Sequence, residues 1–232
     1  MSYSEETLKV EEVDLELARL LVGVAREAIR FYLEKSFRLY EVPRELLERQ
    51  PLLRKKAAVF VTLEKIAEVG GKRVPELRGC IGFVEPVYPL HVAIVESAVS
   101  SAFGDPRFPP VKLSELGEIV IVLTILGEKI PVSSLDEVVI GRDGLYVEMK
   151  ASGRRLFAGV LLPEVPVEYC WDIQTFADMT CRKAGLEPGC WKDPLTTLYR
   201  IPGRTFRELE PGGEVVEADL VKEYRERCTG GF

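Results

Sequence analysis

The residues best suited to chemistry lie in the segment Leu77-Arg78-Gly79-Cys80-Ile81-Gly82, where two glycines flank a cysteine in an otherwise strand-like sequence. Glycine weakens the interior of a strand, so two glycines this close indicate that another backbone segment or a ligand approaches here. Because side chains alternate along a strand, Arg78 and Cys80 are expected on one face and Leu77 and Ile81 on the other. A neighbouring cation favours the reactive thiolate form of a cysteine. The segment therefore predicts a site with Cys80 and Arg78 as candidate catalytic residues, without specifying a reaction.

Two interpretations of Cys80 stay open on the sequence. As a nucleophile it needs a base, and the single histidine, His91, begins the next predicted helix, where a capping or surface role is commoner. In the other interpretation Cys80 is a small packing residue and the glycines admit a neighbouring segment of the chain. Two interpretations of Arg78 are open as well. Its planar guanidinium can bind a carboxylate or phosphate of a ligand, or it can form an ion pair with Glu76 on the same strand face.

A second group of candidates follows the motif. Asp105 and Arg107 lie in a loop stiffened by prolines, where they either complete a polar rim or bind each other in a salt bridge. Phe108 either stacks on a ligand or enters the core. The candidate binding residues are Gly79, Ile81, Gly82, Glu85, Asp105, Arg107 and Phe108.

Several function classes are disfavoured. The chain has no Cys-x-x-Cys and one histidine, so no zinc site is expected. Phosphate-loop, dinucleotide-binding and nucleophile-elbow motifs do not occur either, so no cofactor is predicted. The formal net charge of -6 gives no general attraction to nucleic acid, and Arg54-Lys55-Lys56 is the one basic run.

The expected location is the cytoplasm. Met1 to Glu12 is polar and acidic, and the longest apolar stretch, Ile119 to Leu126, is too short to cross a bilayer. The chain has no asparagine and two glutamines, a depletion typical of hyperthermophile proteins, whose interiors tolerate disulfides. Spacing allows Cys181 or Cys170 to pair with Cys190 and does not fix a pairing among Cys170, Cys181, Cys190 and Cys228. The expectation is that each cysteine is reduced and buried.

Hydrophobic periodicity predicts the elements around the motif. In the first half these are a helix from Asp14 to about Ser36, a short helix after Pro43, a strand over Ala57–Lys65 turned by Gly70-Gly71 into the Cys80 strand, and a helix from Pro89 to Ala102. The second half contains a doubly buried strand over Glu118–Leu126, strands over Leu145–Lys150 and Arg155–Leu162 joined at Ser152-Gly153, a helix from Asp172 to Gly185, strands over Thr197–Ile201 and Thr205–Leu209, and a helix over Ala218–Arg227.

These elements predict an α+β protein, a two-lobed single domain with a mainly antiparallel sheet flanked by helices. The spacing Gly82-x-x-x-Pro86-x-x-Pro89 recurs as Gly159-x-x-x-Pro163-x-x-Pro166, which is consistent with an internal duplication and a groove between two lobes. The expected division is an N-terminal extension over residues 1–13, the domain over 14–209, and a charged tail over 210–232.

Ordered blocks of sequence carry a family resemblance. They are Leu77–Gly82, Glu85-Pro86, Tyr88-Pro89-Leu90, Ala102-Phe103, Asp105–Pro110, Gly144-Leu145, Leu161-Leu162-Pro163, Trp171-Asp172, Lys183–Leu186 and Trp191-Lys192-Asp193. Over roughly Leu15 to Phe206 the chain resembles the AMMECR family, named after the Alport syndrome, midface hypoplasia and elliptocytosis chromosomal region. The resemblance implies a two-lobed α+β protein of unsettled biochemical role, with the cysteine motif as its functional site. Phe83 departs from the small polar residue usual there, which makes the entrance to a pocket more apolar.

The resemblance also implies partners, because prokaryotic members are similar to domains found beside Memo-like proteins and radical S-adenosylmethionine proteins. The leading hypothesis is therefore a cytoplasmic protein whose groove at Arg78–Gly82 binds a small molecule or a partner segment, acting in a modification pathway with such proteins. Whether it catalyses a reaction stays open. The competing hypothesis is a non-catalytic adaptor that docks those partners through the same motif, and nucleic-acid binding is the third and least favoured.

Overall fold

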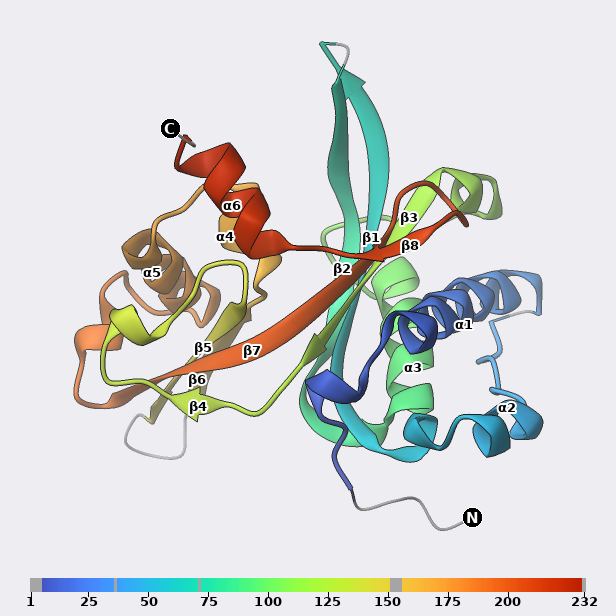
Figure 1. Ribbon diagram of the computed structural model, residues 1–232, viewed down its shortest axis with the longest axis horizontal. Coiled ribbons are helices and arrows are strands. Elements are labelled where there is room, and N and C mark those ends of the chain that lie inside the picture. Colours follow the sequence, from blue (N-terminus) through green and yellow to red (C-terminus); the bar gives the residue numbers. More distant parts are fainter. Residues whose placement is uncertain (1–5, 36, 71, 151–155, 231–232) are drawn as a thin grey trace. The chain divides into compact units, whose positions relative to one another are not determined.

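The protein is described by a computed structural model that covers residues 6–35, 37–70, 72–150 and 156–230 (Figure 1). The chain divides into two compact units. Unit 1 contains residues 1–125 and 205–218, and unit 2 contains residues 126–204 and 219–232. Each unit has its own hydrophobic core, and each is described by itself below.

The helices of unit 1 begin where their capping residues predict. Asp14 accepts a hydrogen bond from the backbone N–H of Leu17 at 2.7 Å, and α1 follows over Leu15–Glu34. The predicted end of this helix, Ser36, lies outside the described residues. Pro89 precedes α3, Leu90–Phe103, which differs by one residue at each end from the predicted range of Pro89 to Ala102. Shorter elements are α2 (Arg44–Arg49) and the 3-10 turns η1 (Val10–Glu12), η2 (Pro51–Arg54) and η3 (Leu113–Glu118).

The sheet of unit 1 has the order β2–β1–β3, followed by the C-terminal part of β7, which also pairs with β8. The strands are β1 (Lys56–Val69), β2 (Lys72–Pro89), β3 (Ile119–Leu126), β7 (Thr196–Glu208) and β8 (Val215–Glu217). Helices α1 and α3 pack on β1 and β3 around one core, which includes Leu21, Val61 and Ile121 (Figure 1). Every residue of β3 is buried, as its doubly apolar sequence predicts.

Unit 2 combines β4 (Ile130–Pro131), β5 (Asp143–Lys150), β6 (Leu156–Leu161) and the N-terminal part of β7. Strand β5 pairs with both β6 and β7, antiparallel in each case. Asp172 caps α5, Ile173–Lys183, and Gly185 follows with a φ of 76°, as the sequence predicts. The unit also contains α4 (Glu164–Glu168), α6 (Leu220–Cys228), η4 (Leu135–Glu137) and η5 (Cys190–Lys192).

The fold class is therefore α+β, with an antiparallel sheet flanked by helices, as predicted. The prediction of two final strands is wrong, because Thr197–Ile201 and the first four residues of Thr205–Leu209 belong to the single strand β7, which ends at Glu208. Pro202 has no N–H to donate, and β7 accommodates it because its partner is Asp143, the first residue of β5. Its carbonyl accepts the N–H of Gly127 at 2.7 Å. The predicted turn at Ser152-Gly153 lies outside the described residues. Among the helices of the described residues, none has the length and apolar character to span a membrane.

The prediction that all cysteines are reduced is wrong for four of them. Cys170 is bonded to Cys228, and Cys181 is bonded to Cys190. The Cα atoms of the two pairs are 5.1 and 5.8 Å apart, within the range that a disulfide spans. Sequence spacing could not identify the first pair, because 58 positions separate its members and the fold alone brings them together. Cys80 is the one cysteine outside these bonds.

Candidate functional site

The Cys80 motif lies in β2, where β2 pairs with β1. Thr62 is opposite Cys80, and Leu63 is opposite Gly79, but the register shifts between Leu63 and Glu64, so that Glu64 is opposite Leu77. Arg78 is the extra residue of a β-bulge, which ends the regular alternation of side chains at this point. The expectation that Arg78 and Cys80 share a face depends on that alternation, so it is wrong.

Arg78, itself buried, instead lies in an ion-pair cluster with the half-buried Glu115 and Lys65. Its Nε and Nη2 donate to the two carboxylate oxygens of Glu115, each at 3.3 Å, and Lys65 Nζ lies 2.9 Å from the same carboxylate. Lys65 is two residues from the fully buried Leu63, which places the cluster on the Leu63 face of the hairpin. Arg78 is 8% exposed, and its Nη1 atom has no hydrogen-bond partner among the described residues. Arg78 therefore pairs with Glu115 and not with Glu76, the alternative partner that the sequence offered, and it lies on the face opposite the thiol.

Glu115 is the ion-pair partner of the buried Arg78, and the sequence analysis did not identify it. Burial raises the pKa of this carboxyl, but hydrogen bonds from Lys65, the backbone of Lys112 and Arg78 outweigh it and bring the pKa to about 2. A charged Glu115 thus neutralises the buried guanidinium. The sequence carries no local signal for this contact, because Glu115 comes from η3 and not from the hairpin.

The space beside the two glycines is filled by the protein itself. A Cβ atom on Gly79 would lie 2.1 Å from the carbonyl oxygen of Ser101 in α3. One on Gly82 would lie 2.3 Å from the carbonyl oxygen of Val59 and 2.4 Å from the ring of Phe60 in β1. These approaches agree with the interpretation in which the glycines admit neighbouring segments of the chain. They leave no space for a ligand in place of the missing side chains.

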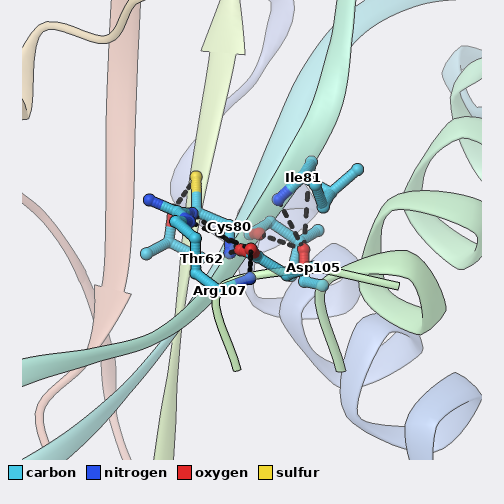
Figure 2. A network of polar contacts seen from close by, with 7 residues as sticks. Thr62, Cys80, Ile81, Asp105 and Arg107 are labelled. Carbon is cyan, nitrogen blue, oxygen red and sulfur yellow. Dashed lines mark hydrogen bonds and ion pairs between the residues drawn. The ribbon is translucent and has the colours of Figure 1, made fainter. Parts of the chain in front are cut away.

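Side chains from the end of α3 hold the backbone of the motif (Figure 2). The hydroxyl of Ser101 accepts the N–H of Ile81 at 2.8 Å and donates to the carbonyl of Val61 at 2.6 Å, so it bridges β1 and β2. The carboxylate of Asp105 accepts the N–H of Cys80 through Oδ2 at 2.9 Å. Two consecutive backbone donors are therefore satisfied by side chains, which fixes the position of Cys80.

Asp105 and Arg107 bind each other, which is one of the two alternatives that the sequence left open. Arg107 Nε donates to Oδ1 at 2.9 Å, and Nη2 donates to Oδ2 at 2.6 Å. The guanidinium of Arg107, helped by the backbone N–H groups of Cys80 and Arg107, lowers the pKa of the 4% exposed Asp105 to about 2, although burial opposes this. The guanidinium also lies over the ring of Phe108, 5.4 Å from its centroid.

The thiol of Cys80 lies on the Thr62 face of the hairpin. Thr62 Oγ1 donates a hydrogen bond to the sulfur at 3.1 Å, and Cys80 is partly exposed. Because Asp105 Oδ2 binds both Cys80 N and Arg107 Nη2, the guanidinium of Arg107 is close to Cys80. Figure 2 shows this guanidinium and the sulfur on the same side of the hairpin. Arg107 thus occupies the place beside the thiol that the sequence assigned to Arg78.

Two other candidates lie away from the thiol. His91 is in the first turn of α3, with Nδ1 2.7 Å from the carbonyl oxygen of Leu53, whereas Ser101, ten residues later in the same helix, contacts the motif. A rise of 1.5 Å per residue puts His91 roughly 15 Å along the helix from that contact, so the structure does not pair it with Cys80. Glu85 is exposed further along β2.

The groups around Cys80 can stabilise negative charge on the sulfur and on a group that approaches it. We define the thiol surface as Cys80, Thr62 and Arg107. A hydroxyl donor and a guanidinium both favour negative charge on sulfur, and the same guanidinium favours a negatively charged group that approaches from solvent. Among the described residues, no group of three or more histidine, cysteine, aspartate or glutamate side chains is arranged to hold a metal ion.

Comparison with known proteins identifies a family and agrees with the fold. The family model AMMECR1 matches residues 22–206. Protein SSO0193 of Saccharolobus solfataricus is 40% identical over 215 residues, which is 90% of this chain and 89% of that protein. A protein of Thermococcus gammatolerans is 41% identical over 214 residues, covering 89% of this chain and 97% of that protein.

A solved structure is also similar. The crystal structure of the uncharacterised protein PH0010 from Pyrococcus horikoshii matches with a TM-score of 0.80 and 38% sequence identity, over 89% of this chain and 98% of that one. The extent of the family match and these identities lead to one conclusion. The chain belongs to the AMMECR1 family.

Proposed function

We propose that the protein is a binding protein whose ligand, a small molecule or a segment of a partner protein, contacts the thiol surface formed by Cys80, Thr62 and Arg107. The observation that carries the proposal is the shared carboxylate oxygen of Asp105, which fixes Cys80 and Arg107 next to each other. A site whose groups are held in place before binding loses less conformational freedom when the ligand arrives.

The chemistry of the thiol surface favours a ligand with an anionic or acceptor group. The side chain of Arg107 is 46% exposed while its partner Asp105 is buried, so the guanidinium is the accessible half of the pair. Guanidinium groups bind carboxylates and phosphates with directional N–H donors. The ligand therefore approaches the sulfur side of the hairpin, because the protein itself fills the space next to Gly79 and Gly82.

The proposal extends to the cellular context. It takes the protein to act in the cytoplasm, with Memo-like and radical S-adenosylmethionine proteins as the candidate partners in a modification pathway. Support for these partners comes from the family resemblance alone. An adaptor that docks such a partner and a receptor for a small anion use the same thiol surface, and they differ in whether the sulfur itself is needed.

Substitution of Cys80 separates the two roles. If the thiol surface is only a docking surface, Cys80→Ser leaves partner binding nearly intact, because serine has almost the same shape and accepts the same hydrogen bond from Thr62. If Cys80 is a nucleophile, the same substitution abolishes activity while the unfolding temperature stays unchanged, since oxygen does not replace the thiolate.

Accessibility of the thiol tests the proposal first. The other four cysteines are in disulfides, so Cys80 is the thiol that iodoacetamide modifies in the oxidised protein. We expect the native protein to react within about tenfold of the rate in denaturant, measured by mass spectrometry. A native rate more than about a thousandfold lower would show that the sulfur is sealed, and it would overturn the proposed site.

Binding is tested with defined anions. Inorganic phosphate, acetate and succinate are added to the native protein, and the unfolding temperature is recorded. We expect at least one anion to raise it for the wild type and for Arg44→Met, which removes an exposed arginine paired with Glu48 elsewhere in unit 1. Arg107→Met should lose that increase. An equal increase for Arg107→Met and Arg44→Met would place the binding elsewhere.

A further inference from the structure

The C-terminal helix α6 is anchored to one short segment of unit 2. Tyr224 donates its hydroxyl hydrogen to the carbonyl of Trp171 at 2.9 Å, and Arg227 Nη2 donates to the carbonyl of Glu168 at 2.9 Å. Cys228 is bonded to Cys170. Positions 224, 227 and 228 lie on one face of a helix, so this face meets residues 168–171 at the end of α4.

The cysteine that receives α6 occupies an unusual backbone position. After α4 the N–H of Trp171 donates to the carbonyl of Pro166 at 2.9 Å, and the N–H of Cys170 donates to that of Val167 at 3.4 Å. This is a Schellman ending, whose left-handed position normally belongs to glycine. Cys170 holds that position with a φ of 50°. A side chain there costs conformational energy, so a cysteine in place of glycine indicates that its sulfur has a use.

Helix α6 also forms one side of an open pocket. A volume of about 470 Å³ lies between Val221, Tyr224 and Arg225 of α6 and a wall that includes residues 138–140 and Ile173. Cavities of roughly 300 to 1,000 Å³ are the size of ligand sites. The apolar attachment of α6 is slight, because Leu220 is its one buried residue and lies at its first position. At the other end, two hydrogen bonds and the disulfide attach the helix to residues 168–171.

We propose that the Cys170–Cys228 disulfide is a redox latch, and that its reduction releases α6 and removes one side of the pocket that this helix lines. The reductant is a dithiol. Its first thiolate attacks one sulfur of the bond, the other sulfur leaves as a thiolate and takes up a proton, and its second thiolate resolves the mixed disulfide. Cys170 and Cys228 end as two thiols, and the dithiol ends as a disulfide after giving up two electrons. The second disulfide, Cys181–Cys190, joins α5 to η5 and does not hold α6.

Hydrogen exchange on the full-length protein tests the latch. Backbone exchange of residues 220–228 and 135–140 is followed by mass spectrometry, with and without dithiothreitol. We expect reduction to speed exchange of both segments by at least about tenfold more than it speeds exchange in α5. A variant with Cys181→Ser and Cys190→Ser should behave like the wild type, and one with Cys170→Ser and Cys228→Ser should exchange rapidly under both conditions.

Two results of this experiment would overturn the latch. Unchanged exchange of residues 220–228 after complete reduction of both disulfides, verified by alkylation and mass spectrometry, would overturn the latch. Loss of protection in α5 to the same extent as in α6 would also overturn it, because it would mean that reduction unfolds unit 2. The comparison with and without reductant is made within the wild type, so a serine variant that does not fold leaves the test intact.

Discussion

The missing side chain of Gly79 is what allows α3 to pack against the Cys80 hairpin. A Cβ atom on Gly79 would lie only 2.1 Å from the carbonyl oxygen of Ser101, which is too close for two atoms that are not bonded. Because this neighbour is backbone within a helix, it cannot move aside as the end of a flexible side chain can. The requirement for glycine at this position is therefore steric and comes from the fold itself.

Gly79→Ala tests this requirement. We expect it to lower the free energy of unfolding by about 2 kcal/mol or more, in the range for overpacking a close contact, as measured by urea denaturation. Gly23→Ala is the matched control, because Gly23 lies in α1 with nothing within 4 Å of the position that a methyl group would take, and alanine favours helix by about 0.5–1 kcal/mol. Equal effects of the two substitutions would contradict the steric explanation.

Asp105 makes the stability of the protein depend on pH. Its folded pKa of about 2 lies below its ordinary value of 3.8, so its contribution is present above pH 4 and is lost as the pH falls toward 2. The depression corresponds to about 2 kcal/mol. The difference in unfolding free energy between wild type and Asp105→Asn should thus shrink by about that amount from pH 6 to pH 2. Glu115 titrates in the same window but is present in both proteins, so a constant difference would contradict the assignment.

At the scale of elements, the hydroxyl of Ser101 joins the end of α3 to both strands of the hairpin. It replaces a direct hydrogen bond between Ile81 N–H and the carbonyl of Val61. Helix α3 is therefore connected to β1 and β2 by hydrogen bonds as well as by apolar packing. The position of the Cys80 backbone depends on this connection.

Ser101→Ala should destabilise the protein by about 1–3 kcal/mol, because it leaves the N–H of Ile81 without its acceptor in a partly buried place. Hydrogen exchange of the Ile81 amide should accelerate accordingly. Ser97→Ala is the control, since Ser97 lies one turn earlier in α3 with a buried hydroxyl that has no hydrogen-bond partner among the described residues, and its loss should be neutral or stabilising. A larger effect at Ser97 than at Ser101 would refute this role.

Local signals were enough to predict most elements and not enough to predict the site. Asp14 and Asp172 cap their helices, and the run over Ile119–Leu126 is buried throughout, because caps and periodicity are properties of neighbouring residues. The bulge at Arg78 has no such signature, since it depends on how β2 pairs with β1. The arginine beside the thiol is therefore Arg107, which arrives from the loop after α3, and not the one two positions from Cys80.

At the scale of the whole molecule, the two units differ in how they are stabilised. Unit 1 has a large apolar core formed by α1, α3, β1 and β3, and its one cysteine, Cys80, is not in a disulfide. Unit 2 has a smaller core around Val147 and Phe176 and contains both disulfides. The two disulfides thus lie in the unit with the smaller apolar core, in a chain whose sequence is poor in amide side chains and rich in charged ones.

Reduction should therefore weaken unit 2 selectively. Chain-entropy arguments give up to about 4 kcal/mol for a link across 58 residues and about 3 kcal/mol for one across nine, while unit 1 has no such link to lose. We expect reductant to lower the midpoint of the thermal transition monitored in unit 2 by at least about 5 °C, and to leave that of unit 1 unchanged. Peptide-resolved hydrogen exchange during heating distinguishes the units. Equal shifts in both would contradict this division.

The central claim is that Arg107 lies beside the thiol of Cys80 and gives the site its preference for anions. The most direct measurement compares alkylation of native Cys80 by anionic iodoacetate and by neutral iodoacetamide. We predict that Arg107→Met lowers the ratio of the two rates by about fivefold, whereas Arg107→Lys and Arg44→Met leave most of it in place, because the positive charge attracts only the anionic reagent. A ratio that is the same in Arg107→Met and in the wild type would contradict the account.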